Sequence, residues 1–191
     1  MLQAADRGHI VNVSSVNGFW ATLGPQVSHT AYSAAKFAVK GFTEALINDL
    51  RLHAPHLTCS VVMPGHIGTA IVKNTGKVLG VGDAQSMSAD TLAKVRDRMV
   101  RGGAPVADAS DTALRELLGR QAQSFQDDAP TTADQAAAII LDGVRAGRWR
   151  ILVGADAQRL DEMVRANPEG AYEASFADFW RLASQRSSGQ G

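Results

Sequence analysis

Three short apolar runs, rich in β-branched residues, are the clearest strand signals along the chain. They cover residues 9–14, 57–62 and 149–153. Runs of this length and composition are typical of strands that are buried in a parallel sheet. Turn residues follow two of them, since Gly18 comes soon after the first run and Pro64-Gly65 directly after the second.

Between and after these runs, apolar residues recur at the three- and four-residue spacing of helices. The longest such stretch is 30–53, where Phe37, Leu46 and Leu50 share one stripe among small alanines, and Pro55 ends it. Further helices are expected near 89–101, 111–121, 132–146, 156–166 and 170–184. Strands that alternate with helices predict an α/β fold with a parallel sheet.

The expected domain organisation is a single partial domain over residues 1–186. Three strands are few for a parallel sheet, and the first one lies at the start of the chain, so the chain resembles part of a larger sheet. Residues 70–130 are the least regular part, and their early glycines indicate a mobile loop that precedes two helices. Residues 187–191 are expected to be a disordered tail.

Composition narrows the class of protein. The 191 residues include 19 lysines and arginines and 19 aspartates and glutamates, so the formal net charge is zero, and neither nucleic acid nor an anionic membrane is an expected partner. Cys59 is the single cysteine, which excludes an internal disulfide, and no zinc-site spacing is present. No run reaches the roughly 18 apolar residues of a membrane span, and the N-terminus lacks the apolar core of a signal peptide. A cytoplasmic protein without a metal is expected.

The sharpest candidate chemistry is the pair Tyr32 and Lys36, four residues apart in the predicted helix 30–53. At this spacing both side chains lie on one helical face. A free tyrosine has a pKa near ~10, and a cation about 4 Å away favours the phenolate by roughly 4 kcal/mol at an effective dielectric constant of ~20. The pair could therefore exchange a proton near neutral pH. The plainer alternative is a surface Tyr/Lys pair, which is common by chance.

The context of the pair favours the chemical interpretation. Ser15 follows the first predicted strand, and the segment Pro64–Thr69 follows the second. Open α/β sheets bind ligands at the carboxyl ends of their strands. A serine hydroxyl there can hydrogen-bond a substrate oxygen and stabilise charge that develops on it. We therefore expect Ser15 and this segment to lie near the start of the helix that carries Tyr32.

These segments together resemble the short-chain dehydrogenase/reductase family. The resemblance rests on residues 9–15, 31–39, 41–46 and 62–69, and it extends more weakly over 132–153. It implies a Rossmann-like, doubly wound parallel sheet, and a reversible hydride transfer between NAD(P) and an alcohol or ketone. The sequence order of serine, Tyr-x-x-x-Lys and Pro-Gly-x-x-x-Thr makes the match specific.

The resemblance also implies a role for each matching residue. Tyr32 corresponds to the general acid/base, Lys36 to the residue that activates it and hydrogen-bonds the nicotinamide ribose, and Ser15 to the residue that orients the substrate oxygen. Ser14 is the weaker candidate for that last role. The cofactor-binding set comprises Tyr32, Lys36, Pro64, Gly65, Ile67 and Thr69.

The chain departs from the family pattern in three places. No strand, Gly-rich turn and helix for the pyrophosphate precedes the first strand, so a sheet truncated at its N-terminus is expected and the choice between NAD and NADP stays open. The segment between Ser15 and Tyr32 is longer than usual in the family. Residues 70–130 are also long, and they suggest a lid over a largely apolar substrate.

Two functions remain compatible with the sequence. The first is an oxidoreductase, a homo-oligomer if full length. The second is an inactive truncated remnant or an association module that binds no cofactor alone. Binding of NAD(P)H would separate them.

Overall fold

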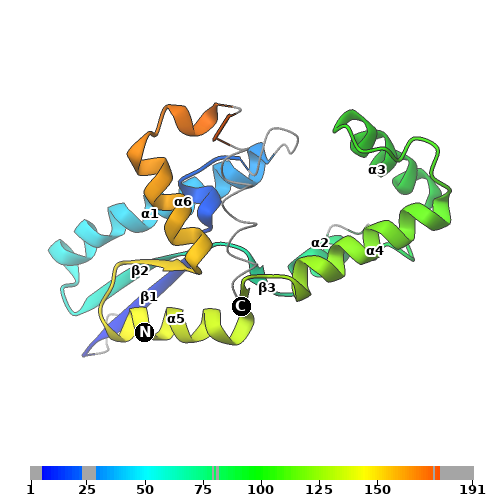
Figure 1. Ribbon diagram of the computed structural model, residues 1–191. Coiled ribbons are helices and arrows are strands. Elements are labelled where there is room, and N and C mark those ends of the chain that lie inside the picture. Colours follow the sequence, from blue (N-terminus) through cyan, green and yellow to red (C-terminus); the bar gives the residue numbers. More distant parts are fainter. Residues whose placement is uncertain (1–5, 23–28, 79, 81, 174, 177–191) are drawn as a thin grey trace. The chain divides into compact units, whose positions relative to one another are not determined.

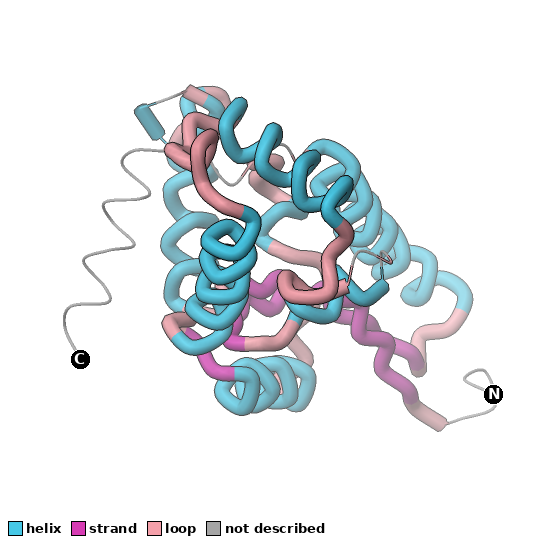
Figure 2. Tube along the Cα trace, turned by 90° about the vertical axis from the view of Figure 1, so that its right-hand side faces the viewer, coloured by secondary structure: helices cyan, strands magenta, loops and turns pink. Residues whose placement is uncertain are grey.

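The computed structural model describes residues 6–22, 29–78, 80, 82–173 and 175–176. Three parallel strands form the main sheet in the order β1-β2-β5, with bounds Gly8–Val13, Leu57–Pro64 and Arg150–Val153. Figure 2 shows these strands running next to one another. Strand β1 is an edge, and its register with β2 pairs Gly8 with Leu57 and Val13 with Val62.

Helices cover both faces of this sheet. Helix α1 (Thr30–His53) packs its residues Leu46 and Leu50 against Leu57 and Cys59 of β2. Helix α5 (Ala133–Arg145) packs on the opposite face, against Val62 and the β5 residues Ile151 and Val153 (Figure 1). Burial raises the pKa of the Cys59 thiol, as expected for a cysteine that serves as a small apolar core residue.

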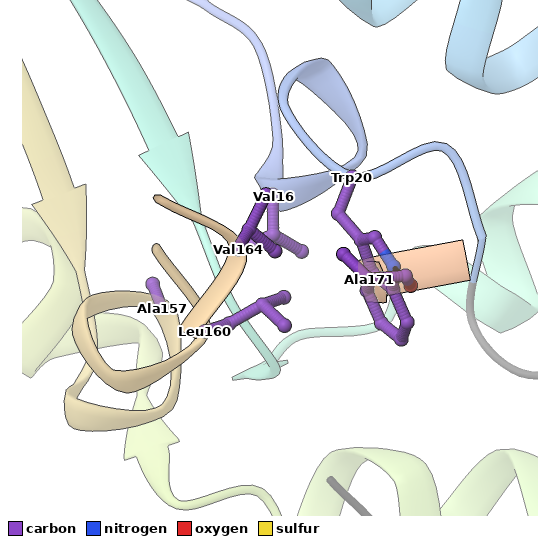
Figure 3. Close-up of a cluster of buried hydrophobic side chains, with 6 residues drawn as sticks. All are labelled: Val16, Trp20, Ala157, Leu160, Val164 and Ala171. Carbon is purple, nitrogen blue, oxygen red and sulfur yellow. Dashed lines mark hydrogen bonds between the residues drawn. The ribbon is translucent and has the colours of Figure 1, made fainter. Parts of the chain in front are cut away.

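A second cluster of buried side chains joins the end of β1 to helix α6 (Ala155–Ala166). Figure 3 shows its members, which come from α6, the 3-10 helix η2 (Val16–Gly18), the 3-10 helix η3 (Gly170–Tyr172) and, in the case of Trp20, the segment after η2. Trp20 is fully buried in it, and its indole N–H donates to the Ala171 carbonyl at 2.8 Å. A buried indole needs such a partner for its N–H, so this bond fixes the chain just after Ser15.

The chain divides into two compact units. Residues 1–67 and 133–191 form the first, which contains the sheet, and residues 68–132 form the second. The second contains α2 (Ile71–Val78), α3 (Ala89–Arg101) and α4 (Asp111–Asp127). Its core is made by Leu92, Val106 and Leu114. Two-residue strands β3 (Ile67–Gly68) and β4 (Thr131–Thr132) pair where the chain enters and leaves it.

The predicted α/β fold with a parallel sheet is confirmed, and most predicted elements lie where the sequence placed them. One prediction is wrong, because residues 71–78 form a helix that includes Gly76, rather than a mobile loop. The expected tail 187–191 and most of the expected helix 170–184 lie outside the described residues.

Candidate active site

The two serines that follow β1 have different environments. Ser14 is buried, and its hydroxyl donates to the Lys36 carbonyl at 2.7 Å. Ser15 caps η2, and its Oγ accepts from the Asn17 N–H at 3.2 Å. The one hydroxyl hydrogen of Ser14 is therefore committed to the backbone of α1. Ser15 uses a lone pair in its bond with the Asn17 N–H, so its own O–H can still be donated.

Tyr32 and Lys36 lie one turn apart at the start of α1, as predicted. The ammonium of Lys36 lies 5.6 Å from the centroid of the Tyr32 ring, within the range of a cation–π contact. The Tyr32 side chain is 41% exposed, and the ring of His29 meets it edge-on at 6.0 Å. The phenol is thus accessible to a ligand and has a cation beside it.

Three hydrogen bonds join helix α1 to strand β1 and to Ser14, which directly follows that strand. Besides the bond from Ser14, Lys36 Nζ donates to the Val13 carbonyl at 3.1 Å, and Asn12 Nδ2 donates to Thr43 Oγ1 at 3.0 Å. Gly18 of η2 also lies close to both Ser14 and α1, because a Cβ on Gly18 would lie 2.3 Å from the Ser14 hydroxyl and 3.0 Å from the Lys36 carbonyl. A residue larger than glycine at 18 would therefore disturb the position of Lys36.

Asn17 and Ser33 connect the serine turn to the first turn of α1. Asn17 Nδ2 donates to Ser33 Oγ at 3.3 Å, and Ser33 Oγ donates to the Ala21 carbonyl at 3.1 Å. Both side chains are buried. These bonds bring Ser15 and the start of α1 into one region. Within the part of the chain that the structure describes, Ser15 and Tyr32 share no direct hydrogen bond.

The segment after β2 lies at the same edge of the sheet. The Gly65 N–H donates to the Val153 carbonyl at 3.0 Å, and Ile67 packs on the core beneath α5. The His66 N–H donates to a carboxylate oxygen of Asp156 at 2.7 Å. Sequence reasoning missed Asp156. An acid in the first turn of a helix that follows a strand was the only local sign, since its partner lies 90 positions away.

Thr69, the last residue of the predicted set, belongs to the second unit. It lines a pocket of about 350 Å³ within that unit, together with Ala70, Ile71, Asn74, Thr75 and Val78. Ser15, Tyr32, Lys36, Pro64, Gly65 and Ile67 all belong to the first unit.

The described residues contain no group of three or more His, Cys, Asp or Glu side chains that could hold a metal ion. A search of the same residues finds no helix with the length and apolar character needed to cross a membrane.

Sequence comparisons find related proteins. A family model described as short chain dehydrogenase matches residues 1–79. SadH of Mycobacterium tuberculosis, which is classed provisionally as an oxidoreductase, is 33% identical over 164 residues, which is 85% of this chain and 45% of SadH. Acetoacetyl-CoA reductase of Cupriavidus necator is 44% identical over 71 residues, 36% of this chain and 26% of that protein. The chain therefore spans less than half the length of these relatives.

Solved structures share the fold. A short chain dehydrogenase/reductase from Burkholderia phymatum, in complex with NAD, matches with a TM-score of 0.55 at 23% identity and covers 89% of this chain and 50% of that one. A short chain dehydrogenase from Burkholderia cenocepacia, in complex with NADP, matches with a TM-score of 0.51 at 18% identity, over 90% of this chain and 48% of that one. At these identities the likeness supports the Rossmann-like fold alone.

Proposed function

We propose that the chain carries the catalytic portion of an NAD(P)-dependent oxidoreductase of the short-chain dehydrogenase/reductase family, on the basis of the family model that matches residues 1–79 and the similarity to SadH. The proposed reaction is a reversible hydride transfer between the nicotinamide and the carbon of an alcohol or ketone. The main support is the arrangement at the start of α1, where the exposed phenol of Tyr32 has the Lys36 ammonium beside it, and where Asn17, in the turn that Ser15 caps, donates to Ser33.

The proton chemistry follows from this arrangement. In the reducing direction, Tyr32 donates its phenolic proton to the substrate oxygen as that oxygen becomes an alkoxide, and Lys36 stabilises the phenolate that remains. Ser15 donates its O–H to the same substrate oxygen, because Ser15 Oγ only accepts in its bond with the Asn17 N–H and its hydrogen stays available. In the oxidising direction the same proton returns to Tyr32.

The residues that are present suit the nicotinamide end of the cofactor. Lys36 and Tyr32 carry the donors that a ribose hydroxyl needs, and the segment Pro64–Ile67 lies at the carboxyl edge of the sheet, with Thr69 following it in the chain. The bound nicotinamide supplies or accepts the hydride. The chain itself contains no Gly-rich turn for the pyrophosphate, and the proposed cofactor is NAD or NADP.

The remaining parts of the proposal concern the substrate, the oligomeric state and the cellular location. We expect a small, largely apolar alcohol or ketone as substrate, with residues 70–130 acting as a lid over it. We also expect a cytoplasmic homo-oligomer that binds neither nucleic acid nor membranes.

The experiment uses the gene product that includes any coding sequence read in frame before Met1, here called the complete gene product. NAD(P)H binding is followed by fluorescence titration, and turnover is measured on a panel of apolar ketones and alcohols. Tyr32→Phe should lower kcat by at least about a hundredfold, because general acid catalysis contributes on the order of that factor or more, while cofactor binding survives.

Tyr172→Phe is the matched control, since the chain has only two tyrosines. The Tyr172 hydroxyl accepts one bond from the Ala21 N–H at 3.2 Å and lies on the exposed end of η3. Its removal should leave kcat near that of the wild type. Retained turnover in Tyr32→Phe would remove Tyr32 from its role, and absence of NAD(P)H binding by the wild type would refute the proposed function.

A further inference from the structure

Asp156 lies where the carboxyl ends of β2 and β5 meet. It is the second residue of α6, and Gly154, which precedes that helix, has φ of 102°. Residues other than glycine rarely adopt this backbone conformation. Glycine at 154 therefore allows the sharp turn from β5 into α6. That path directs the Asp156 carboxylate toward the segment that follows β2.

The two oxygens of the Asp156 carboxylate differ in their hydrogen bonding. One oxygen, Oδ2, accepts from the His66 N–H at 2.7 Å. The other, Oδ1, is buried and, among the described residues, has no hydrogen-bond partner. A buried carboxylate oxygen without a partner costs stability, even at a helix N-terminus that favours negative charge. A role in stability alone would favour a neutral side chain at this position.

Gly65 is fitted to Asp156. A Cβ built on Gly65 would lie 2.2 Å from Oδ2 and 2.5 Å from both other atoms of the carboxylate, and these are its three nearest neighbours. The absence of a side chain at 65 therefore allows the carboxylate to approach the backbone and bond the next N–H. The glycine at 65 and the carboxylate at 156 therefore depend on each other for their fit. The bond that results joins His66 and Asp156, which are 90 positions apart in the chain.

We propose that Asp156 is a positioning residue, which holds the backbone of Gly65–Ile67 in the conformation that receives the nicotinamide end of the cofactor. This positioning role rests on the proposed function, because it requires that the segment binds NAD(P). Asp156 itself does not touch the reacting atoms. It acts through the main chain of the segment, which is anchored on its other side by the Gly65 N–H bond to Val153.

The first test compares three variants of the complete gene product. Asp156→Ala removes the acceptor for the His66 N–H and should raise the KM for NAD(P)H about tenfold, with a smaller change in kcat. Asp156→Asn keeps an acceptor oxygen and should return the KM to within about threefold of the wild type. Asp134→Ala is the matched control, because Asp134 is also the second residue of its helix but is exposed. It should leave the KM unchanged.

The second test measures the coupling of Gly65 and Asp156. Gly65→Ala alone should lower both the melting temperature and the affinity for NAD(P)H, since its Cβ meets the carboxylate. In the Asp156→Ala background the same substitution meets no carboxylate and should add little further loss. Melting can be measured without any cofactor, so it reads the contact independently of the reaction.

The outcomes separate the two proposals. If Asp156→Ala lowers the melting temperature but leaves the KM for NAD(P)H unchanged, the residue is merely structural and the positioning role is wrong. Equal losses from Gly65→Ala in both backgrounds would also overturn it, because the contact would then carry no coupling. If the wild type binds no NAD(P)H, the proposed function itself fails and the positioning role fails with it, whatever the melting data show.

Discussion

The ion cluster around Asp161 predicts how much one charge stabilises the unit that contains the sheet. Asp161 lies in α6 with a side chain that is 10% exposed. Both oxygens accept from the Arg150 guanidinium, one of them at 2.9 Å, and Arg165 Nε adds bonds at 3.0 and 3.1 Å. Arg150 also lies 5.8 Å above the ring centroid of Phe19. The cluster thus connects β5, α6 and the segment after η2.

Asp161→Asn keeps the shape of the side chain and removes its charge. Arg150 is then left largely buried without a counter-ion, and losing one partner of a buried pair costs about 3–5 kcal/mol. Arg165 is well exposed, so its share is at most about 1 kcal/mol. Because Asn retains an acceptor for Arg150, we expect the lower end of the range, about 3 kcal/mol. For a domain of this size that is a fall in melting temperature of about 6–12 °C.

The difference between wild type and variant should depend on pH. Burial by itself raises the pKa of Asp161, but the hydrogen bonds and charges of Arg150 and Arg165 outweigh burial and hold that pKa below its usual value. A carboxyl group whose pKa is lowered by folding stabilises the protein above its unfolded pKa of ~3.9, and this stabilisation is lost as the pH falls through the folded pKa. The gap should therefore be constant between about pH 6 and 8 and narrow below about pH 4.

The assay is thermal unfolding of the complete gene product followed by circular dichroism across this pH range. Glu162→Gln is the control, because it changes the same charge one position along the helix on an exposed side chain. It should alter the free energy of unfolding by less than about 0.5 kcal/mol. If Asp161→Asn melts with the wild type at pH 7, or if the gap persists unchanged at pH 3, the ion cluster does not contribute in the way described.

Two further predictions concern β1 and the 3-10 helix η2 that follows it. Gly18→Ala should lower both stability and turnover, since its Cβ would lie 2.3 Å from the Ser14 hydroxyl and 3.0 Å from the Lys36 carbonyl; adding Ser14→Ala should not restore activity, because the carbonyl contact remains, and full recovery in the double variant would refute this. The 191-residue chain expressed alone should self-associate with rising concentration in light scattering, because β1 is an edge strand on which Val11 and Val13 are 40% and 53% exposed. A monodisperse monomer at high concentration would contradict it.

The fold was predictable where the pattern is local. The spacing of Phe37, Leu46 and Leu50 and the stop before Pro55 defined α1 with the bounds that the structure has. The region after Thr69 was harder, because glycines that usually mark loops fall at the end of α2 and just beyond it. There, residues 71–78 form a helix despite the low helix propensity of Gly76.

The candidate site also has a part that follows from local sequence spacing and a part that does not. Tyr32 and Lys36 share one helical face because of their spacing, and that part of the prediction depends on helix geometry alone. The different hydrogen bonds of Ser14 and Ser15 were harder to predict. Which serine faces α1 depends on the register of β1 and on the turn into η2, and the contact of Ser14 with the Lys36 carbonyl shows the result.

The contact of Asp156 with the segment after β2 could not be predicted from local sequence, and it explains why residue 65 is a glycine. A glycine after a proline at the end of a strand is expected of any turn, and by that reasoning Gly65 needs no partner. In the structure, Gly65 is not among the residues with positive φ. The need for glycine there comes instead from the carboxylate that occupies the space of a side chain. A turn residue that is selected by a distant acid is a reason to expect that the conformation of this segment matters, since a turn formed only to reverse the chain would need no such contact.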